Sequence, residues 1–174
     1  IGIEMEGLRV SMNSEGMAVY SHQKNRVFDE FLVRVRSRFP GTRMMARQES
    51  VKTLLRGLKD GLFLQLSPDL DLGARDAIFV PFFGVQAATV TALSRLTRLA
   101  DAILVPVVVR QLPGGEGYVI RMYPAWENYP GESVEADTRR MNAFIEERVL
   151  EMPEQYYWVH KRFKTRPEGE PTIY

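Results

Sequence analysis

Residues 49–73 read ESVKTLLRGLKDGLFLQLSPDLDLG, and this stretch decides the fold class. Its first half places four apolar side chains at helical spacing, on one face: Val51, Leu54, Leu55 and Leu58. Gly61 supplies a C-terminal stop for a helix over 49–60. The apolar run 62–66 then predicts a strand, and Ser67-Pro68-Asp69 predicts a turn after it. A helix followed by a strand and a polar turn is typical of an α/β sheet.

The rest of the chain repeats this alternation. Its patterns predict further helices over residues 3–13, 26–38, 89–100 and 135–151, and strands over 17–21, 102–109 and 118–123. The strand over 102–109 is the clearest buried one, because it is rich in β-branched residues. Pro113-Gly114-Gly115 is a turn that pairs the last two strands as a hairpin. We therefore expect an α/β domain with a mixed, mostly parallel sheet flanked by helices.

The composition excludes several classes of protein and site. A chain of 174 residues with 45% hydrophobic residues fits one globular domain. The absence of cysteine excludes disulfide scaffolds, thiolate metal sites and cysteine nucleophiles. The two histidines, His22 and His160, have no metal-site spacing, and no apolar run has the length of a membrane span. A formal net charge of +1 without a sustained basic stripe argues against a nucleic-acid partner.

Two carboxylates follow the strand over 62–66. In open α/β sheets ligands bind beyond the C-terminal ends of strands, and segments 21–25, 67–73 and 110–111 occupy such positions. Asp69 and Asp71 in the second segment can bind a divalent cation, hold a general base or orient a substrate hydroxyl. They can equally be turn residues that cap backbone amides.

Basic and apolar side chains suggest further sites. Arginines 34, 36 and 38 fan across the polar side of the helix over 26–38, opposite Phe28 and Phe31. They are either solvated charges or a site for an anion such as phosphate or an acidic carrier protein. Arg47 begins a loop and is a better phosphate candidate. The apolar segment 79–84 is either a buried strand or a surface for an acyl chain or a bilayer.

The histidines offer no obvious general base, since neither has a carboxylate near it at helical spacing. His160, in an aromatic and basic segment near the end of the chain, is interpreted as structural. His22 stands at the end of a predicted strand and remains a functional candidate.

Three stretches together resemble the lipid A biosynthesis lauroyl/myristoyl acyltransferase family. The most specific is PEQYYWVHKRFKTRP over 153–167, which is similar to the family's closing signature. The second is PDLDLG over 68–73, followed by FVPFFG over 79–84 and Ala87-Ala88-Thr89. The third is Tyr20 to Asn25, which leads into Phe28-Asp29. The resemblance covers essentially the whole chain and implies a glycerol-3-phosphate acyltransferase-like fold.

The resemblance also implies a reaction, in which an acyl group passes from acyl carrier protein to a hydroxyl of a lipid A precursor. The family uses a His-x4-Asp/Glu motif, and Ile1-Gly2-Ile3-Glu4 resembles the end of it, with Glu4 as the acid. Residues 1–174 are then expected to be a single acyltransferase domain that starts after the histidine and the membrane helix. The histidine would lie two positions before Ile1, so the chain alone is expected not to turn over.

By the same resemblance, four residues are expected to bind substrate: Arg36, Arg47, Asp69 and Asp71. Arg38 is the alternative to Arg36, and Arg47 is the phosphate-binding arginine. The expected partners are the acyl carrier protein thioester, the lipid A precursor and the cytoplasmic face of the inner membrane. No cofactor and no metal are expected. The alternatives are another glycolipid or aminolipid acceptor, or a non-catalytic lipid- or carrier-binding module if the native chain begins near Ile1.

Overall fold

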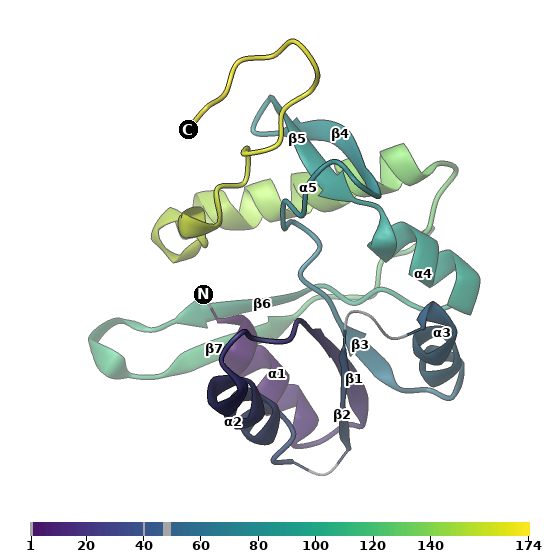
Figure 1. Cartoon of the computed structure of the whole chain (residues 1–174), viewed down its shortest axis with the longest axis vertical. Coiled ribbons are helices and arrows are strands. Elements are labelled where there is room, and N and C mark those ends of the chain that lie inside the picture. Colours follow the sequence, from purple (N-terminus) through teal and green to yellow (C-terminus); the bar gives the residue numbers. More distant parts are fainter. Residues whose placement is uncertain (1, 40, 47–49) are drawn as a thin grey trace.

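The computed structural model describes residues 2–39, 41–46 and 50–174. A three-stranded parallel sheet in the order β2-β1-β3 lies in the lower half of Figure 1. Its strands are β1 (Gly16–Tyr20), β2 (Thr42–Ala46) and β3 (Phe63–Gln65), and they alternate with helices α1 (Ile3–Ser11), α2 (Arg26–Arg36) and α3 (Val51–Lys59). The α/β class predicted from the sequence is confirmed, although β2 is a strand that the periodicity does not predict.

The helices of this layer begin at capping residues and pack on a small apolar core. The Asn25 side chain accepts hydrogen bonds from the amides of Val27 and Phe28 at the start of α2, which satisfies donors that a helix leaves free. Met17 of β1, Met45 of β2 and Leu62 form the buried core. Helix α3 approaches it closely at Gly57, where a Cβ atom would lie 2.3 Å from Sδ of Met17.

The second sheet is the hairpin of β4 (Ala77–Phe82) and β5 (Val85–Val90). Phe83 and Gly84 connect the strands, and both have positive φ angles, as a two-residue type I′ turn requires. The helix predicted over 89–100 is therefore wrong at its start, because Thr89 and Val90 pair with β4. Helix α4 runs over Ala92–Ala100. Residues 79–82 belong to β4, whose Val80 and Phe82 are buried.

The third sheet is the predicted hairpin, made of β6 (Val107–Gln111) and β7 (Tyr118–Met122) with a 3-10 turn over Pro113–Gly115. The expectation of a buried strand from 102 onward is wrong, since β6 starts at Val107 and Ile103 is 80% exposed. In the described part of the chain β6 pairs with β7 alone. Residues 102–106 lie outside this ladder, although the Pro106 and Leu104 carbonyls accept from the amides of Tyr123 and Trp126 at 2.9 Å.

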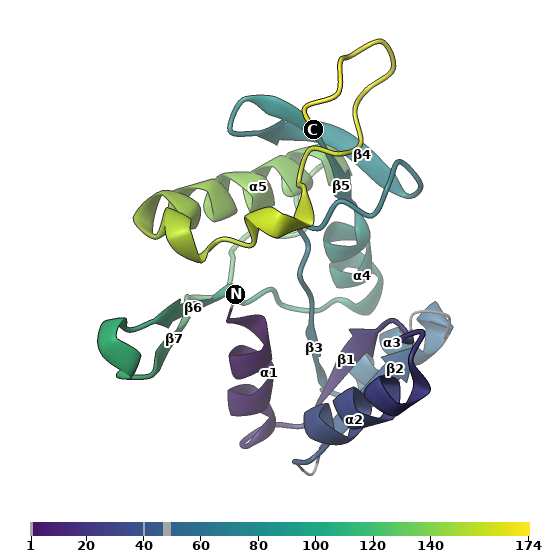
Figure 2. The same ribbon diagram turned by 60° about the vertical axis from the view of Figure 1, so that its left-hand side comes forward.

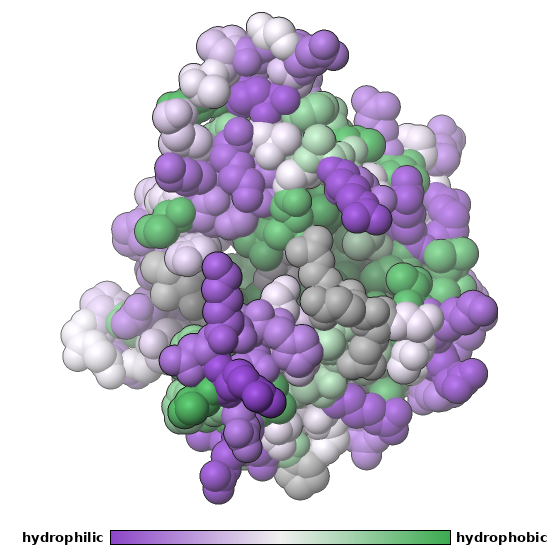
Figure 3. Space-filling view, viewed as in Figure 1, coloured by the Kyte–Doolittle hydropathy of each residue, from purple (hydrophilic) through white to green (hydrophobic). Residues whose placement is uncertain are grey.

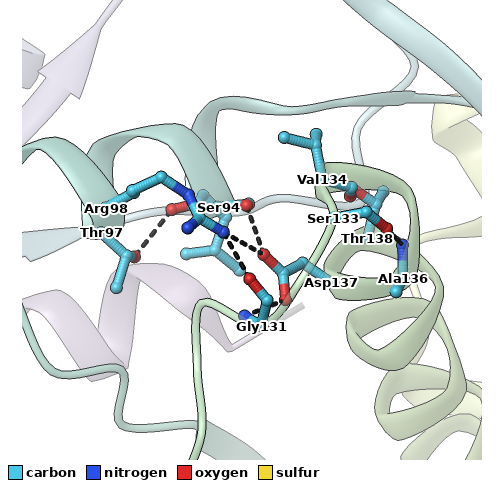
Figure 4. Close-up of polar contacts among 10 residues, drawn as sticks. Ser94, Thr97, Arg98, Gly131, Ser133, Val134, Ala136, Asp137 and Thr138 are labelled. Atoms are coloured by element: carbon cyan, nitrogen blue, oxygen red, sulfur yellow. Dashed lines mark hydrogen bonds and ion pairs between the residues drawn. The ribbon is translucent and has the colours of Figure 1, made fainter.

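Helix α5 (Val134–Glu151) joins the upper elements. The buried carboxylate of Asp137 accepts hydrogen bonds from Ser94 Oγ of α4 at 2.5 Å and from the Gly131 amide at 2.7 Å (Figure 4). Arg98 closes the network with a 2.6 Å hydrogen bond to the Gly131 carbonyl. These bonds fix α4 against the start of α5.

The segment after α5 returns over the β4–β5 hairpin and ends beside it (Figure 2). It contains 3-10 turns over Pro153–Gln155 and Trp158–His160. In both views α5 and the hairpin form an upper layer, and the parallel sheet with α1, α2 and α3 forms a lower one. Across the described ranges, every helix is too short or too polar to cross a lipid bilayer.

Candidate functional site

The C-terminal edge of the parallel sheet gathers several predicted site segments. Because β1, β2 and β3 are parallel, the segments that follow Tyr20, Ala46 and Gln65 leave from one edge. This confirms the placement of segments 21–25 and 67–73. The placement of 110–111 is wrong, because these residues end β6 in a separate antiparallel ribbon. Arg47 would follow β2 but lies outside the described residues.

Glu4 and Arg36 form a two-pronged ion pair. Arg36 Nε donates to Glu4 Oε2 at 3.0 Å, and the second guanidinium nitrogen donates to Glu4 Oε1. The pair joins the first turn of α1 to the last turn of α2, where each charge also suits the helix dipole. The side chains are 55% and 30% exposed. The Arg38 guanidinium instead lies over the Phe39 ring, 4.9 Å from its centroid.

A cavity of about 1150 Å³ lies between the two layers. Its walls come from α1, β3, α4, β6 and α5 and are mainly apolar, and hydrophobic side chains gather in the middle of the face seen in Figure 3. Gly2 and Ile3, just before Glu4, line it. Asp69 and Tyr156 supply polar groups to the same cavity. An apolar chamber with a few polar groups suits a ligand with a long hydrocarbon part.

Asp69 is held by the segment that follows α5. Tyr156 donates its hydroxyl to Asp69 Oδ2 at 2.8 Å. Burial, and then the negative charge of Asp69, raise the pKa of the Tyr156 phenol well above its usual range, so the phenol remains a donor.

Asp71 has a different environment, because its side chain is 0% exposed. Its Oδ1 accepts from the Gly73 amide at 3.0 Å and from Thr165 Oγ1 at 2.8 Å, and its Oδ2 accepts from the Thr165 amide at 2.8 Å. Both oxygens therefore have internal donors, and Asp71 ties the turn to the end of the chain. A direct contact of Asp71 with substrate stays a prediction.

Glu6, which no sequence pattern predicts as a site residue, lines the cavity two residues after Glu4. Burial raises the pKa of its carboxyl to about 7, and a hydrogen bond with the Gln65 side chain opposes that rise. A perturbed acid in a cavity is a mark of functional sites. The one feature of the sequence that could have indicated Glu6 is its position as a glutamate on the apolar side of a short helix.

His22 has the carboxylate partner that helical spacing did not reveal. Its Nδ1 lies 3.0 Å from Oδ2 of Asp29, and Asp29 Oδ1 accepts from the Gln23 amide at 2.7 Å. The amide of Gln23 and then the hydrogen bond from His22 hold the pKa of the Asp29 carboxyl below its usual value. The pair was predictable from the start of the helix at Asn25, because that start places Asp29 in the first turn of the helix, near the end of the preceding strand.

His160 is held within the structure, as interpreted. Its Nε2 accepts from the Asp71 amide at 2.7 Å, which requires the neutral form of the ring. Burial, followed by the charge of Lys164, lowers the pKa of the His160 imidazole and favours that form. Among the described residues no three His, Asp or Glu side chains gather closely enough to hold a metal ion.

Comparison with known proteins places these features in a family context. The family model for bacterial lipid A biosynthesis acyltransferases matches residues 1–165. The lipid A biosynthesis lauroyltransferase of Escherichia coli (strain K12) is 36% identical over 173 residues, which cover 99% of this chain and 56% of that protein. The palmitoleoyltransferase of the same strain is 31% identical over 175 residues, which cover 100% and 56%. Its myristoyltransferase is 34% identical over 167 residues, which cover 94% and 50%. The chain thus spans about half the length of the curated relatives that it matches.

Proposed function

The chain belongs to the bacterial lipid A biosynthesis acyltransferase family, and on this premise we propose that it carries the acyl-transfer site of an enzyme of lipid A biosynthesis. The proposed donor is the thioester of acyl carrier protein, and the proposed acceptor is a hydroxyl of a lipid A precursor. Residues 1–174 would form one acyltransferase domain with a glycerol-3-phosphate acyltransferase-like fold. The observation that carries the proposal is the Glu4–Arg36 pair at the start of α1, next to a large apolar cavity.

In the proposed mechanism a histidine two positions before Ile1 acts as general base. It takes the proton of the acceptor hydroxyl while that oxygen attacks the thioester carbonyl, and the proton then passes to the leaving thiolate. Glu4 would hold the imidazole in the productive tautomer and stabilise its cation. Each carboxylate oxygen can accept more than one hydrogen bond, so Glu4 can stay paired with Arg36 and still bind the histidine. Arg36 thereby fixes the direction of the carboxylate.

The cavity is the proposed binding place of the acyl chain. Its volume of about 1150 Å³ exceeds that of ordinary small-ligand pockets, and leucine and valine side chains dominate its walls. Asp69 would orient the acceptor hydroxyl or a neighbouring polar group, and Arg47 would bind an acceptor phosphate. Asp71 would contribute by holding the turn that presents Asp69.

The cytoplasmic face of the inner membrane is the proposed location. Helix α2 supports a contact with its anionic lipids, because Phe28 and Phe31 stack on its outer face and are 49% and 57% exposed. Arg26 and Arg34 lie on the same helix with Glu30 between them, and hydrophobic and strongly hydrophilic side chains adjoin over α2 in Figure 3. Exposed aromatic rings with flanking cations suit the interface of an acidic bilayer.

The test is an acyl-transfer assay with the complete protein. Incubation with acyl carrier protein thioesters and a lipid A precursor should yield a precursor whose mass rises by one acyl group. A panel of glycolipid and aminolipid acceptors, read by mass spectrometry, separates the lipid A reaction from transfer to another acceptor. No acyl product, under conditions in which a known family member gives one, would overturn the proposal.

A further inference from the structure

The segment over residues 153–166, which we name the C-terminal strap, makes hydrogen bonds with two parts of the chain that lie far before it in the sequence. One part is the turn that carries Asp69 and Asp71, and the other is the β4–β5 hairpin. The strap lies across these elements in both ribbon views (Figures 1 and 2). Its hydrogen bonds with these two parts join residues 73 to 94 positions apart, and Gln155 also exchanges two hydrogen bonds with the backbone of Gln111 in β6.

The strap is anchored to the hairpin by two arginines. Arg162 is 1% exposed and donates to the Ala88 carbonyl at 2.7 Å and to Thr89 Oγ1 at 2.6 Å. Its guanidinium also lies over the Phe82 ring, 5.1 Å from the centroid. Arg166 donates to the Gln86 carbonyl at 2.5 Å. Because Arg162 is buried, a shift of the strap would leave its guanidinium without these hydrogen bonds and without water to replace them, which favours a single position of the strap.

From this anchor the strap holds the turn of the proposed site at three points. Tyr156 donates to Asp69, the His160 ring accepts from the Asp71 amide, and Thr165 donates twice to the Asp71 carboxylate. The Tyr156 hydroxyl occupies Asp69 Oδ2, and both side chains line the cavity. A tyrosine that binds one carboxylate oxygen sets the direction in which the other can meet a ligand.

We infer that Tyr156 is a positioning residue for acceptor binding, which acts by orienting the carboxylate of Asp69 toward the polar group of the acceptor. The inference rests on the proposed function, since it takes Asp69 as the residue that meets the acceptor. The strap is then part of the acceptor site and not only a cover for the hairpin. Tyr157, the next residue, is half exposed and provides a matched control.

The experiment compares Tyr156→Phe, Tyr157→Phe, Asp69→Asn and the Tyr156→Phe/Asp69→Asn double variant in the complete protein. The KM for the lipid A precursor, the KM for the acyl donor, kcat and the Tm are measured for each. Tyr156→Phe should raise the acceptor KM about 10-fold or more, which is the scale of one hydrogen bond to a charged group. The donor KM should stay close to that of Tyr157→Phe, whereas the Tm should fall below that of Tyr157→Phe, because a part-buried hydrogen bond to a charged group is lost.

The double variant separates positioning from a general effect on packing. If Tyr156 acts through Asp69, the double variant should have the acceptor KM of Asp69→Asn alone, because contacting residues are not additive. An impaired Asp69→Asn variant beside a Tyr156→Phe variant that matches Tyr157→Phe would overturn the inference. Full activity of Asp69→Asn would instead remove Asp69 from the proposed function, and an inactive wild type would overturn that function as a whole.

Discussion

The carboxylate of Glu4 receives both hydrogen bonds of the Arg36 guanidinium, across 32 positions of sequence. Two parallel, charge-assisted hydrogen bonds from one guanidinium limit the carboxylate to one orientation. The single ammonium group of a lysine would restrict that orientation less. Two residues farther along α1, Glu6 turns into the cavity and is raised in pKa by burial. The two acids therefore differ in chemistry. Glu4 is an exposed carboxylate paired with Arg36, whereas Glu6 is half-buried and exchanges its proton near neutral pH.

Replacing Glu4 by alanine in the complete protein should reduce turnover at least about 100-fold, which is the lower end of the effect of a general acid–base device. Folding should change little, because the Glu4 side chain is 55% exposed. Initial rates and circular dichroism of the variant test both parts. Wild-type turnover in Glu4→Ala would remove Glu4 from the mechanism.

Glu6 should make the stability of the chain depend on pH. Because burial raises its pKa from 4.5 to about 7, the folded state keeps a proton that the unfolded state releases over this range. Its contribution to stability is complete below pH 4.5 and is lost as the pH rises through 7. Glu6→Gln should therefore be more stable than the wild type at pH 8, by about 1 to 2 kcal/mol after solvent screening.

Urea unfolding at pH 5 and pH 8 measures this difference in the free energy of unfolding. Exposed Glu116→Gln is the control and should show the wild-type pH dependence. An equal pH dependence of Glu6→Gln and the wild type would show that the carboxyl of Glu6 is not perturbed by the cavity.

At the scale of elements, buried polar networks hold helices and hairpins together where the apolar core is small. Asp137 joins α4 to α5 through Ser94 and Gly131 (Figure 4), and Asn142 of α5 donates to the Pro81 carbonyl of β4 at 3.0 Å. Loss of a hydrogen bond to a buried acceptor lowers the free energy of unfolding more than loss of an exposed hydrogen bond, because no water replaces the lost donor.

Asp137→Asn should lower the free energy of unfolding by about 1.5 to 3 kcal/mol, the scale of hydrogen bonds to a charged group. The amide retains the shape but cannot accept from both Ser94 and Gly131 with the same strength. Chemical denaturation provides the measurement, and exposed Glu135→Gln, also in the first turn of α5, is the matched control. Equal losses in the two variants would assign the effect to the helix dipole and not to the network.

The sequence predicted most of the elements, because helical periodicity and turn chemistry are local properties. The helices α3 and α5 and the hairpin around Pro113–Gly115 are present as predicted. The strand β5 could not be predicted from its own residues. Ala87, Ala88 and Thr89 have no strong alternation, and they extend because the Phe83-Gly84 turn folds them onto β4. The exposure of Phe28 and Phe31 likewise depends on which elements pack on α2.

At the scale of the whole molecule, the site is assembled from parts that lie far apart in the chain. Family resemblance points to Glu4 and Arg36 as site residues, and no pattern in the sequence links them. The Tyr156–Asp69 bond spans 87 positions and has no local signature, so only the folded chain reveals it. The common edge of β1 and β3 was predictable, because strands that alternate with helices are usually parallel.

The proposed contact with the membrane would involve the whole molecular surface. Phe28→Ser/Phe31→Ser should weaken co-sedimentation of the complete protein with vesicles of phosphatidylglycerol and phosphatidylcholine, because it removes exposed aromatic area from α2. Higher salt should also weaken the binding of the wild type to these vesicles, because it screens the attraction between arginines and anionic lipids. Leu150→Ser, at an exposed apolar residue of α5, is the control. Equal binding of both variants would exclude α2 as the contact.

In the proposed function acyl transfer depends on Glu4 held by Arg36, and two neighbouring arginines test this dependence most directly. Arg36→Met removes the fork on Glu4, whereas Arg38→Met removes a cation that lies over the Phe39 ring. The measurement is the initial rate of acyl transfer from acyl carrier protein to a lipid A precursor by the complete protein. We predict that Arg36→Met loses at least about 100-fold in rate and that Arg38→Met stays close to the wild type. Equal rates for the two variants, or a loss confined to Arg38→Met, would contradict the proposed role of the Glu4–Arg36 pair.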